Sequence, residues 1–250
     1  MSEAERAAAN AIRELKRLGR PSGDFDAARY FRDAGGLAFY NVGTDRMRAL
    51  ARSIYDAHRE RWSIDDAMAF AGRLMLEKHL ESKSVGIEVV ARYRRNFTPS
   101  LLPRWKTWLA RNYSANWATT DAICGALTGP LLVQFPALAA RMPTWARDRN
   151  MWVRRASAVS LIPSLRRGAA HDVCYHVALQ LHTDREDLIQ KAVGWMLREA
   201  GKTDPARLER HLRTHGPRIP RTTVRYAIER FPPRVRQSLL TATRTALTNR

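Results

Sequence analysis

The residues best suited to chemistry in this chain are a tryptophan and an aspartate in its middle. Trp117 and Asp121 are four positions apart in the segment NWATTDAI. On a helix, this spacing places both side chains on one face, one turn from each other. A second indole, Trp195, follows Lys191 by the same four positions. We expect the two indoles and the carboxylate to converge on one site, although a helical tryptophan is more often a packing residue.

Asp121 also belongs to a row of charged residues that recurs along the second half of the chain. Arg155, Lys191 and Arg225 follow it at separations of 34, 36 and 34 residues, each inside an apolar helical stretch. A period of this length without strands between the helices is typical of stacked helical repeats of the HEAT or armadillo kind. Equivalent positions of such repeats line one surface, so three cations and one carboxylate are expected to share a groove.

Other constellations that support catalysis do not occur in the sequence. The seven histidines form no HExxH motif, and no Walker loop, GxGxxG after a strand, or GxSxG elbow is found. Cys124 and Cys174 lie in apolar helical stretches, where a small buried side chain is the expected role and a disulfide is not. We therefore predict no metal site and no cofactor, which leaves carboxylate and aromatic chemistry.

The charge of the chain indicates a polyanionic partner. Lys and Arg number 43 against 24 Asp and Glu, which gives a formal net charge of +19 and a sequence pI near 11.1. Only six of the basic residues are lysines, and the planar arginine fork suits phosphate oxygens. Nucleic acid is the favoured partner. The alternatives are an acidic membrane, an acidic protein, or the codon usage of a GC-rich genome.

The pattern of apolar residues predicts an all-α protein, a right-handed α-solenoid of HEAT-like repeats with a basic concave groove. We expect a single domain over residues 1–250, with an N-terminal helix at 1–20 and a C-terminal helix and tail at 232–250 as end pieces. No run of about 18 apolar residues is present and the N-terminus is charged, so a cytoplasmic protein is expected. Helices are expected at about 3–18, 24–34, 44–55, 64–76, 84–95, 99–111, 115–127, 130–140, 143–162, 169–181, 185–200, 204–214, 219–230 and 232–246.

Several segments resemble a known family. The stretches ARYFRDA, LMLEKHLESKSVGIEVVARY, NWATTDAI, MWVRRASAV, LIQKAVGWMLREAGKTDP and IPRTTVRYAIE are similar to the DNA alkylation repair glycosylases built from HEAT-like repeats, the AlkD-like family. The resemblance runs from about Arg29 to Phe231, and QKAVGWMLRE is its most specific part. It implies a catalytic Asp121 with Trp117 and Trp195 as site tryptophans. It also implies that Arg155 binds the DNA backbone and that Tyr30 lies in the groove; Arg154, Lys191 and Arg225 are further candidates for DNA binding.

The resemblance implies a DNA N-glycosylase that releases 3-methyladenine and 7-methylguanine from duplex DNA and so begins base excision repair. A base methylated at these positions is cationic and needs no proton to leave, so one carboxylate suffices where ordinary glycoside hydrolysis uses two. The family is further expected to act without turning the base out of the duplex, as a monomer on alkylated double-stranded DNA and not at membranes. Two alternatives remain: a non-catalytic DNA-binding member of the same class, and a helical scaffold for acidic protein partners.

Overall fold

The computed structural model describes residues 1–21, 23, 31 and 37–244, and every regular element in them is helical. An isolated parallel bridge between Ala38 and His79 is the one β-type pairing found in this part of the chain. The all-α prediction is therefore confirmed. The chain divides into two compact units, Met1–Leu131 and Leu132–Arg250, and each is described by itself. The predicted single domain stays a prediction.

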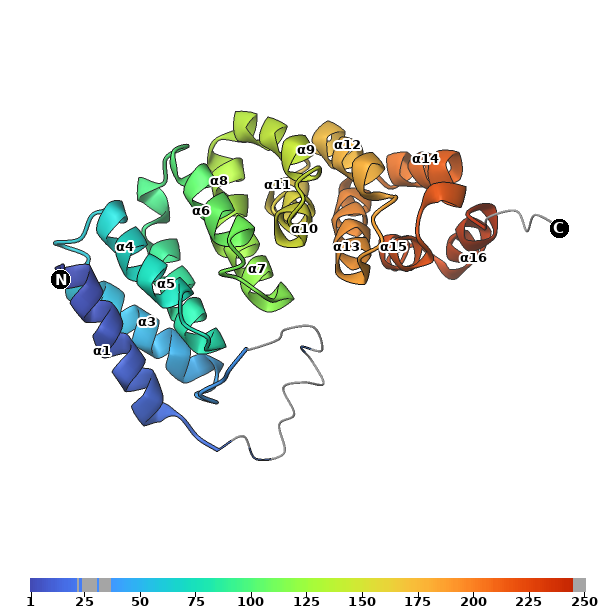
Figure 1. Cartoon of the computed structure of the whole chain (residues 1–250). Helices are drawn as coiled ribbons and strands as arrows, with labels where there is room; N and C mark the ends of the chain where they lie inside the picture. The colour runs from blue at the N-terminus through green and yellow to red at the C-terminus, as the bar shows by residue number, and fades with distance from the viewer. Residues whose placement is uncertain (22, 24–30, 32–36, 245–250) are drawn as a thin grey trace. The chain divides into compact units, whose positions relative to one another are not determined.

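The first unit is built around one central helix, α5. Helices α3, α4 and α7 pack on α5, and α1 packs on α4, as Figure 1 shows from blue to green. Large apolar side chains such as Phe70, Ile87 and Trp105 are buried in its core. The elements are α1 (Glu3–Leu18), α3 (Thr44–His58), α4 (Ile64–Met75), α5 (Leu80–Arg92), the 3₁₀ turn η1 (Arg94–Asn96), α6 (Leu101–Ala110), α7 (Trp117–Ile123) and the π-helical segment η2 (Cys124–Thr128).

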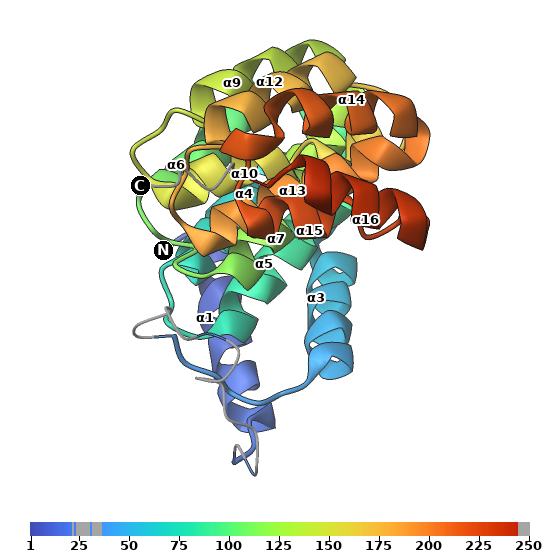
Figure 2. The same ribbon diagram turned by 90° about the vertical axis from the view of Figure 1, so that its right-hand side faces the viewer.

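The second unit consists of helix pairs in two layers. Helices α10, α13 and α15 pack side by side in chain order, while α9, α12 and α14 lie over them (Figures 1 and 2). This is the arrangement expected for stacked helical repeats. The elements are α8 (Gly129–Gln134), which crosses the unit boundary, η3 (Pro136–Arg141), α9 (Met142–Trp145), α10 (Met151–Val159), α11 (Ile162–Leu165), α12 (His171–Leu181), α13 (Asp187–Thr203), α14 (Pro205–His215), η4 (Gly216–Arg218), α15 (Arg221–Ala227) and α16 (Pro233–Ala242).

The helix predicted over 143–162 is wrong, because the chain turns in its middle. The Asp148 carboxylate accepts a hydrogen bond from Asn150 N at 3.0 Å, and the Asn150 side chain accepts one from Trp152 N at 2.8 Å. These bonds form a turn and then cap a new helix, so α9 ends at Trp145 and α10 begins at Met151. Apolar periodicity alone did not reveal this break.

The break predicted between helices at 115–127 and 130–140 is also wrong, because helical residues run without a gap from Trp117 to Gln134 and the chain breaks at Phe135 instead. The remaining helix boundaries agree or differ by a few residues. The helix expected from 84 begins at Leu80, while the helix expected from Asp24 lies outside the described residues. Among the described residues, no single helix is long and apolar enough to cross a membrane, although the bent pair Trp117–Gln134 and Pro136–Trp145 has that length and composition when taken together.

Candidate functional site

Helix α7 carries both residues of the predicted carboxylate and indole pair. Asn116 caps it, since its side chain accepts a hydrogen bond from Thr119 N at 2.8 Å, and Trp117 is the first helical residue. Asp121 follows one turn later, and both side chains are half-buried. The predicted spacing on one helix is confirmed, and it places an acid next to an aromatic ring at a partly exposed position of the first unit.

The backbone after Asp121 departs from regular α-helix. Residues Cys124–Thr128 form a π-helical segment, and the Thr128 hydroxyl bonds to Ile123 O at 3.5 Å and Cys124 O at 3.4 Å. Segments of this kind are rare and often occur at functional sites. The carboxylate therefore lies in the last regular turn before a change in helical pitch.

An aromatic side chain that the sequence analysis did not select stacks on Trp117. The Phe31 ring lies nearly parallel to the indole, with centroids 5.4 Å apart and an interplanar angle of 15°, and Phe39 packs on Phe31 at 5.5 Å. The segment ARYFRDA holds two adjacent aromatic residues, and only contacts could select between them. The predicted groove residue Tyr30 lies outside the described residues.

Charged side chains of α5 hold the loops that surround α7, and the sequence analysis missed them as well. Glu81 is buried, and its carboxylate accepts hydrogen bonds from Tyr40 N at 3.1 Å and Asn41 N at 2.8 Å. His79 stacks on Tyr40 with centroids 3.7 Å apart. The segment that contains Phe39 is therefore fixed to the start of α5. The available signal was a pair of charges, Glu81 and Lys83, in the first turn of α5, ahead of the apolar stretch that follows.

The two neighbouring arginines of α10 in the second unit are both engaged within the protein. Arg155 is only 5% exposed, and its guanidinium donates to Leu188 O at the start of α13. Arg154 donates to the Asp184 carboxylate at 2.7 Å and to Asp148 O at 3.0 Å. Both side chains therefore join α10 to the loops and helix beside it, and their predicted contact with DNA stays a prediction.

Helices α13 and α15 carry the other predicted residues of this unit. Lys191 forms an ion pair with Asp187 at 2.6 Å, and this hydrogen bond raises the pKa of Lys191 while burial and the charge of Arg155 act against it. Trp195 is half-buried one turn further along α13, and Arg225 is exposed on α15. Since α10, α13 and α15 pack in succession, the three cations of the row lie on neighbouring helices.

A glycine explains how closely α13 and α15 approach. A Cβ atom built on Gly194 would lie 2.4 Å from Tyr226 Cβ and 2.8 Å from Thr223 O, so no other side chain fits. The Thr223 hydroxyl also donates to Gln190 O at 2.9 Å. Gly194 immediately precedes Trp195, and the close contact therefore fixes the part of α13 on which this indole stands.

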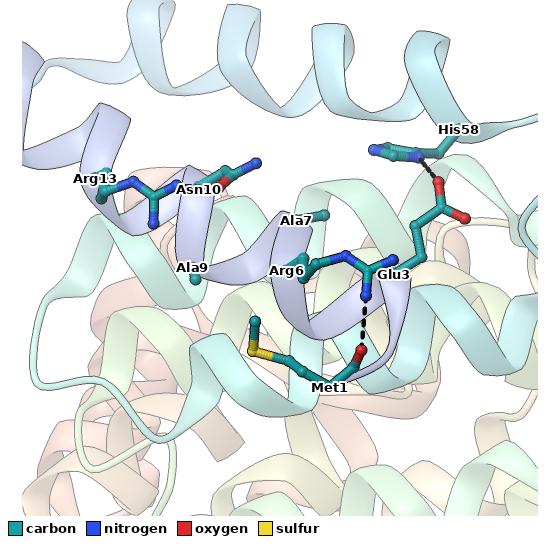
Figure 3. Close-up of a pocket in the computed structure, with 8 residues that line it drawn as sticks. All are labelled: Met1, Glu3, Arg6, Ala7, Ala9, Asn10, Arg13 and His58. Atoms are coloured by element: carbon teal, nitrogen blue, oxygen red, sulfur yellow. Dashed lines mark hydrogen bonds and ion pairs between the residues drawn. The ribbon is translucent and has the colours of Figure 1, made fainter.

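A pocket of about 340 Å³ lies elsewhere in the first unit, and no predicted site residue lines it. Figure 3 shows that it is formed by the start of α1 and the end of α3, where the Glu3 carboxylate meets His58 Nδ1 at 3.1 Å and Arg6 donates to Met1 O at 2.7 Å. Within the described residues, no group of three or more His, Cys, Asp or Glu side chains is arranged to hold a metal ion.

Comparison with known protein families identifies the chain. A family described as "DNA alkylation repair enzyme" matches residues 11–231. The chain belongs to the DNA alkylation repair enzyme family. The match begins within α1 and extends past the end of α15, and so it includes both α7 and the α10, α13 and α15 row. A comparison with curated proteins gave no match.

Two solved structures share the fold of this family member. A predicted DNA alkylation repair enzyme from Enterococcus faecalis aligns with a TM-score of 0.74 and 17% identity, over 86% of this chain and 97% of the other. The alkylpurine DNA glycosylase AlkC from Pseudomonas fluorescens, solved bound to DNA containing an abasic site analog, aligns with a TM-score of 0.56 and 17% identity, over 94% of this chain and 66% of its own. Both likenesses agree with an all-helical DNA alkylation repair fold.

Proposed function

We propose that this protein is a DNA N-glycosylase that hydrolyses the glycosidic bond of cationic alkylpurines, 3-methyladenine and 7-methylguanine, in duplex DNA. The observation that carries the proposal is the placement of Asp121 one turn from Trp117, half-buried on α7, in a member of a DNA alkylation repair family. AlkC, whose fold this chain shares, is an alkylpurine DNA glycosylase solved bound to DNA, which supports the same substrate class.

The proposed chemistry needs only one carboxylate. An alkylated purine already carries a positive charge, so it leaves without a general acid, and positive charge then develops on the deoxyribose. Ionised Asp121 stabilises this oxocarbenium character and orients the attacking water. The Trp117 ring face attracts the same cationic character, by about 0.5–2 kcal/mol depending on desolvation. The role of Trp195 as a second site tryptophan stays a prediction. The glycosidic bond breaks and its electron pair leaves with the base, which departs as neutral methylpurine. Water adds to the sugar carbon and loses a proton to the solvent, and an abasic site remains.

The basic residues of the second unit supply affinity in this proposal. Exposed Arg225 and half-buried Lys191 bind phosphate oxygens of the DNA. Arg154 and Arg155 hold α10 against its neighbours and also contact the DNA backbone. Contacts of this kind are independent of base sequence, and their strength falls with salt. We therefore propose binding to double-stranded DNA with selectivity that comes from the lability of the bond, without the target base being turned out of the duplex.

The decisive experiment compares base release by Asp121→Asn and wild-type protein on methylated duplex DNA. The amide keeps the size of the side chain and removes its charge, so base release should fall at least about a hundredfold while DNA affinity stays equal or rises. Asp56→Asn is a matched control, because Asp56 is an exposed aspartate on α3 of the same unit. Full activity in Asp121→Asn would show that Asp121 is not the catalytic group.

Product analysis separates the glycosylase from the alternative, a non-catalytic DNA-binding protein of the same family. The proposal expects free methylpurine and an alkali-labile abasic site from methylated duplex, and little uracil or hypoxanthine release from matched duplexes, since neutral bases are poorer leaving groups. Salt-sensitive binding without any released base would support the alternative. Efficient uracil release would contradict the proposed dependence on a cationic base.

A further inference from the structure

A buried lysine on α5 is not accounted for by the proposed chemistry. Lys83 is only 5% exposed, and its ammonium donates to Met75 O at 2.7 Å and to Tyr113 O at 2.6 Å. The described residues place no carboxylate within ion-pair distance of it. Two backbone carbonyl groups from different parts of the first unit therefore hold one cation between them.

This arrangement is costly for the protein and so points to a specific role. Burial lowers the pKa of Lys83 to about 8, and the nearby Glu77 carboxylate opposes this only in part. A methionine would fill a similar volume without the cost of desolvating a charge. What methionine lacks is the ability to donate to the two carbonyl groups.

Tyr113 belongs to the loop that leads into α7, and this loop has an unusual backbone. Asn112 and Ala115 have φ angles of 59° and 51°, a left-handed conformation that residues other than glycine adopt at a cost. Loops of this kind persist when surrounding bonds fix them. Tyr113 N donates to Trp108 O at 2.8 Å, and the Tyr113 carbonyl accepts from Lys83.

The loop determines where the site residues begin. Asn116 donates to Ser114 O at 2.7 Å and caps α7. The position of Tyr113 therefore determines where α7 begins, and with it the positions of Trp117 and Asp121. A displacement of about 1 Å at a catalytic group can reduce a rate as much as a hundredfold. A tether three residues before the cap can therefore control the rate without touching the substrate.

We infer that Lys83 is a positioning residue for the alkylpurine glycosylase reaction: its ammonium fixes the loop before α7 and thereby sets the positions of Trp117 and Asp121. The inference rests on the proposed function. The same helix holds the opposite loop, because Glu81 binds Tyr40 N and Asn41 N. The two buried charges of α5, Glu81 and Lys83, thus hold the segments that carry Phe39 and Trp117.

The test compares Lys83→Met and Lys83→Arg with a control, Lys78→Met, which removes an exposed lysine five residues away. Hydrogen exchange measured without DNA should show at least about tenfold faster exchange in residues 113–121 of Lys83→Met, and wild-type exchange in α1 and α4. Single-turnover base release should fall about tenfold to a hundredfold, with DNA affinity within about twofold of wild type. Lys83→Arg, which keeps the donors, should recover part of both losses.

The outcomes distinguish the inference from the proposed function. Faster exchange limited to the loop and a lower rate of base release support a positioning role. Unchanged exchange in the loop, unchanged base release by an active protein, or exchange that rises equally throughout the first unit overturns it, since the last result would mean a general role in folding. A wild-type protein that releases no base contradicts the proposed function, while the exchange experiment still decides whether Lys83 fixes the loop.

Discussion

The carboxylate site of the first unit and the cationic row of the second differ in how their backbones are built. Asp121 lies between a loop with two left-handed residues, Asn112 and Ala115, and a π-helical segment. Lys191 and Arg225 stand instead on regular helices that pack closely through Gly194. Irregular backbone costs free energy and can aim a side chain, whereas regular helices place similar residues at equal intervals. The contrast agrees with the chemistry proposed for the first unit and the phosphate binding proposed for the second.

Buried charges follow the same division. In the first unit, Lys83 and Glu81 bind backbone groups of loops. In the second unit, buried Glu199 on α13 binds the side chains of Arg166 at 2.9 Å and Lys202 at 2.8 Å. Buried Arg155 on α10 donates to Leu188 O of α13. Burial alone would raise the pKa of Glu199, but the bonds to these two cations lower it overall. The buried charges beside the site therefore fix loops, whereas buried Arg155 joins neighbouring helices of the row.

The largest expected difference between the units is in the effect of the two tryptophans on base release. Trp117→Ala should reduce the rate about tenfold to a hundredfold, because it removes the ring beside Asp121 and the stacking partner of Phe31. Trp195→Ala should reduce the rate of base release less, because α13 is a regular helix that stays in place when the indole is removed. Single-turnover rates on methylated duplex measure both. A larger loss in Trp195→Ala would break the division, because the second unit would then contribute most to chemistry.

Sequence reasoning predicted the parts of this arrangement that depend on periodicity. The helical period gave the fold class, and spacings of about 35 residues placed Arg155, Lys191 and Arg225 on α10, α13 and α15, which pack in succession. A spacing of four put Trp117 and Asp121 on one helix. These predictions succeeded because a regular repeat converts sequence distance into spatial distance.

The missed parts depend on contacts between segments far apart in the sequence. Phe31 stacks on Trp117, Glu81 binds Tyr40 N, and Lys83 binds Tyr113 O. In each pair, no periodic pattern connects one residue to the other. The break at 148–150 was missed because apolar periodicity resumes directly after it, and the capping by Asn150 depends on side-chain hydrogen bonds that periodicity does not show. Local hydrogen bonds and loop contacts therefore limit what the pattern of residues can reveal.

The second prediction concerns acid stability, which should be a property of the second unit. His182 and His211 are buried, with ring nitrogens 2.9 Å apart, and burial lowers the pKa of His182 to about 3 and that of His211 to about 4. The charge of His215 lowers both pKa values further. In the unfolded chain, both histidines bind a proton near pH 6.5. The free energy of unfolding should therefore be highest above that pH and fall as the pH decreases toward 4.

Chemical denaturation of His211→Phe and wild type at pH 7.5 and pH 4.5 measures this effect. The variant should lose less stability between the two pH values, because one buried group no longer takes up a proton on unfolding. His176→Gln, which changes an exposed histidine of α12, should behave as wild type. Equal losses in His211→Phe and wild type would show that other groups cause the acid sensitivity.

The third prediction tests the close packing that makes the row regular. Gly194→Ala should destabilise the protein by about 1–3 kcal/mol, because the new Cβ would meet Tyr226 Cβ and Thr223 O, and the clash outweighs the gain in helix propensity. Gly72→Ala is the matched control, since a Cβ at this position of α4 meets nothing within 4 Å. That change should stabilise by about 0.5–1 kcal/mol. Urea unfolding measures both, and a stabilising Gly194→Ala would contradict the close approach of α13 and α15.

The smallest effects are expected from single cations of the row. Lys191→Met and Arg225→Met should each weaken binding to duplex DNA by less than about tenfold, lower the slope of log affinity against log salt by about one, and leave the single-turnover rate at saturating protein unchanged. Lys191 should lose less than Arg225, because its ion pair with Asp187 already satisfies part of its charge. Arg59→Met, at an exposed arginine near the end of α3, is the control. A lower rate at saturation would mean that the row takes part in more than phosphate binding. An unchanged salt slope would mean that the row does not bind phosphate.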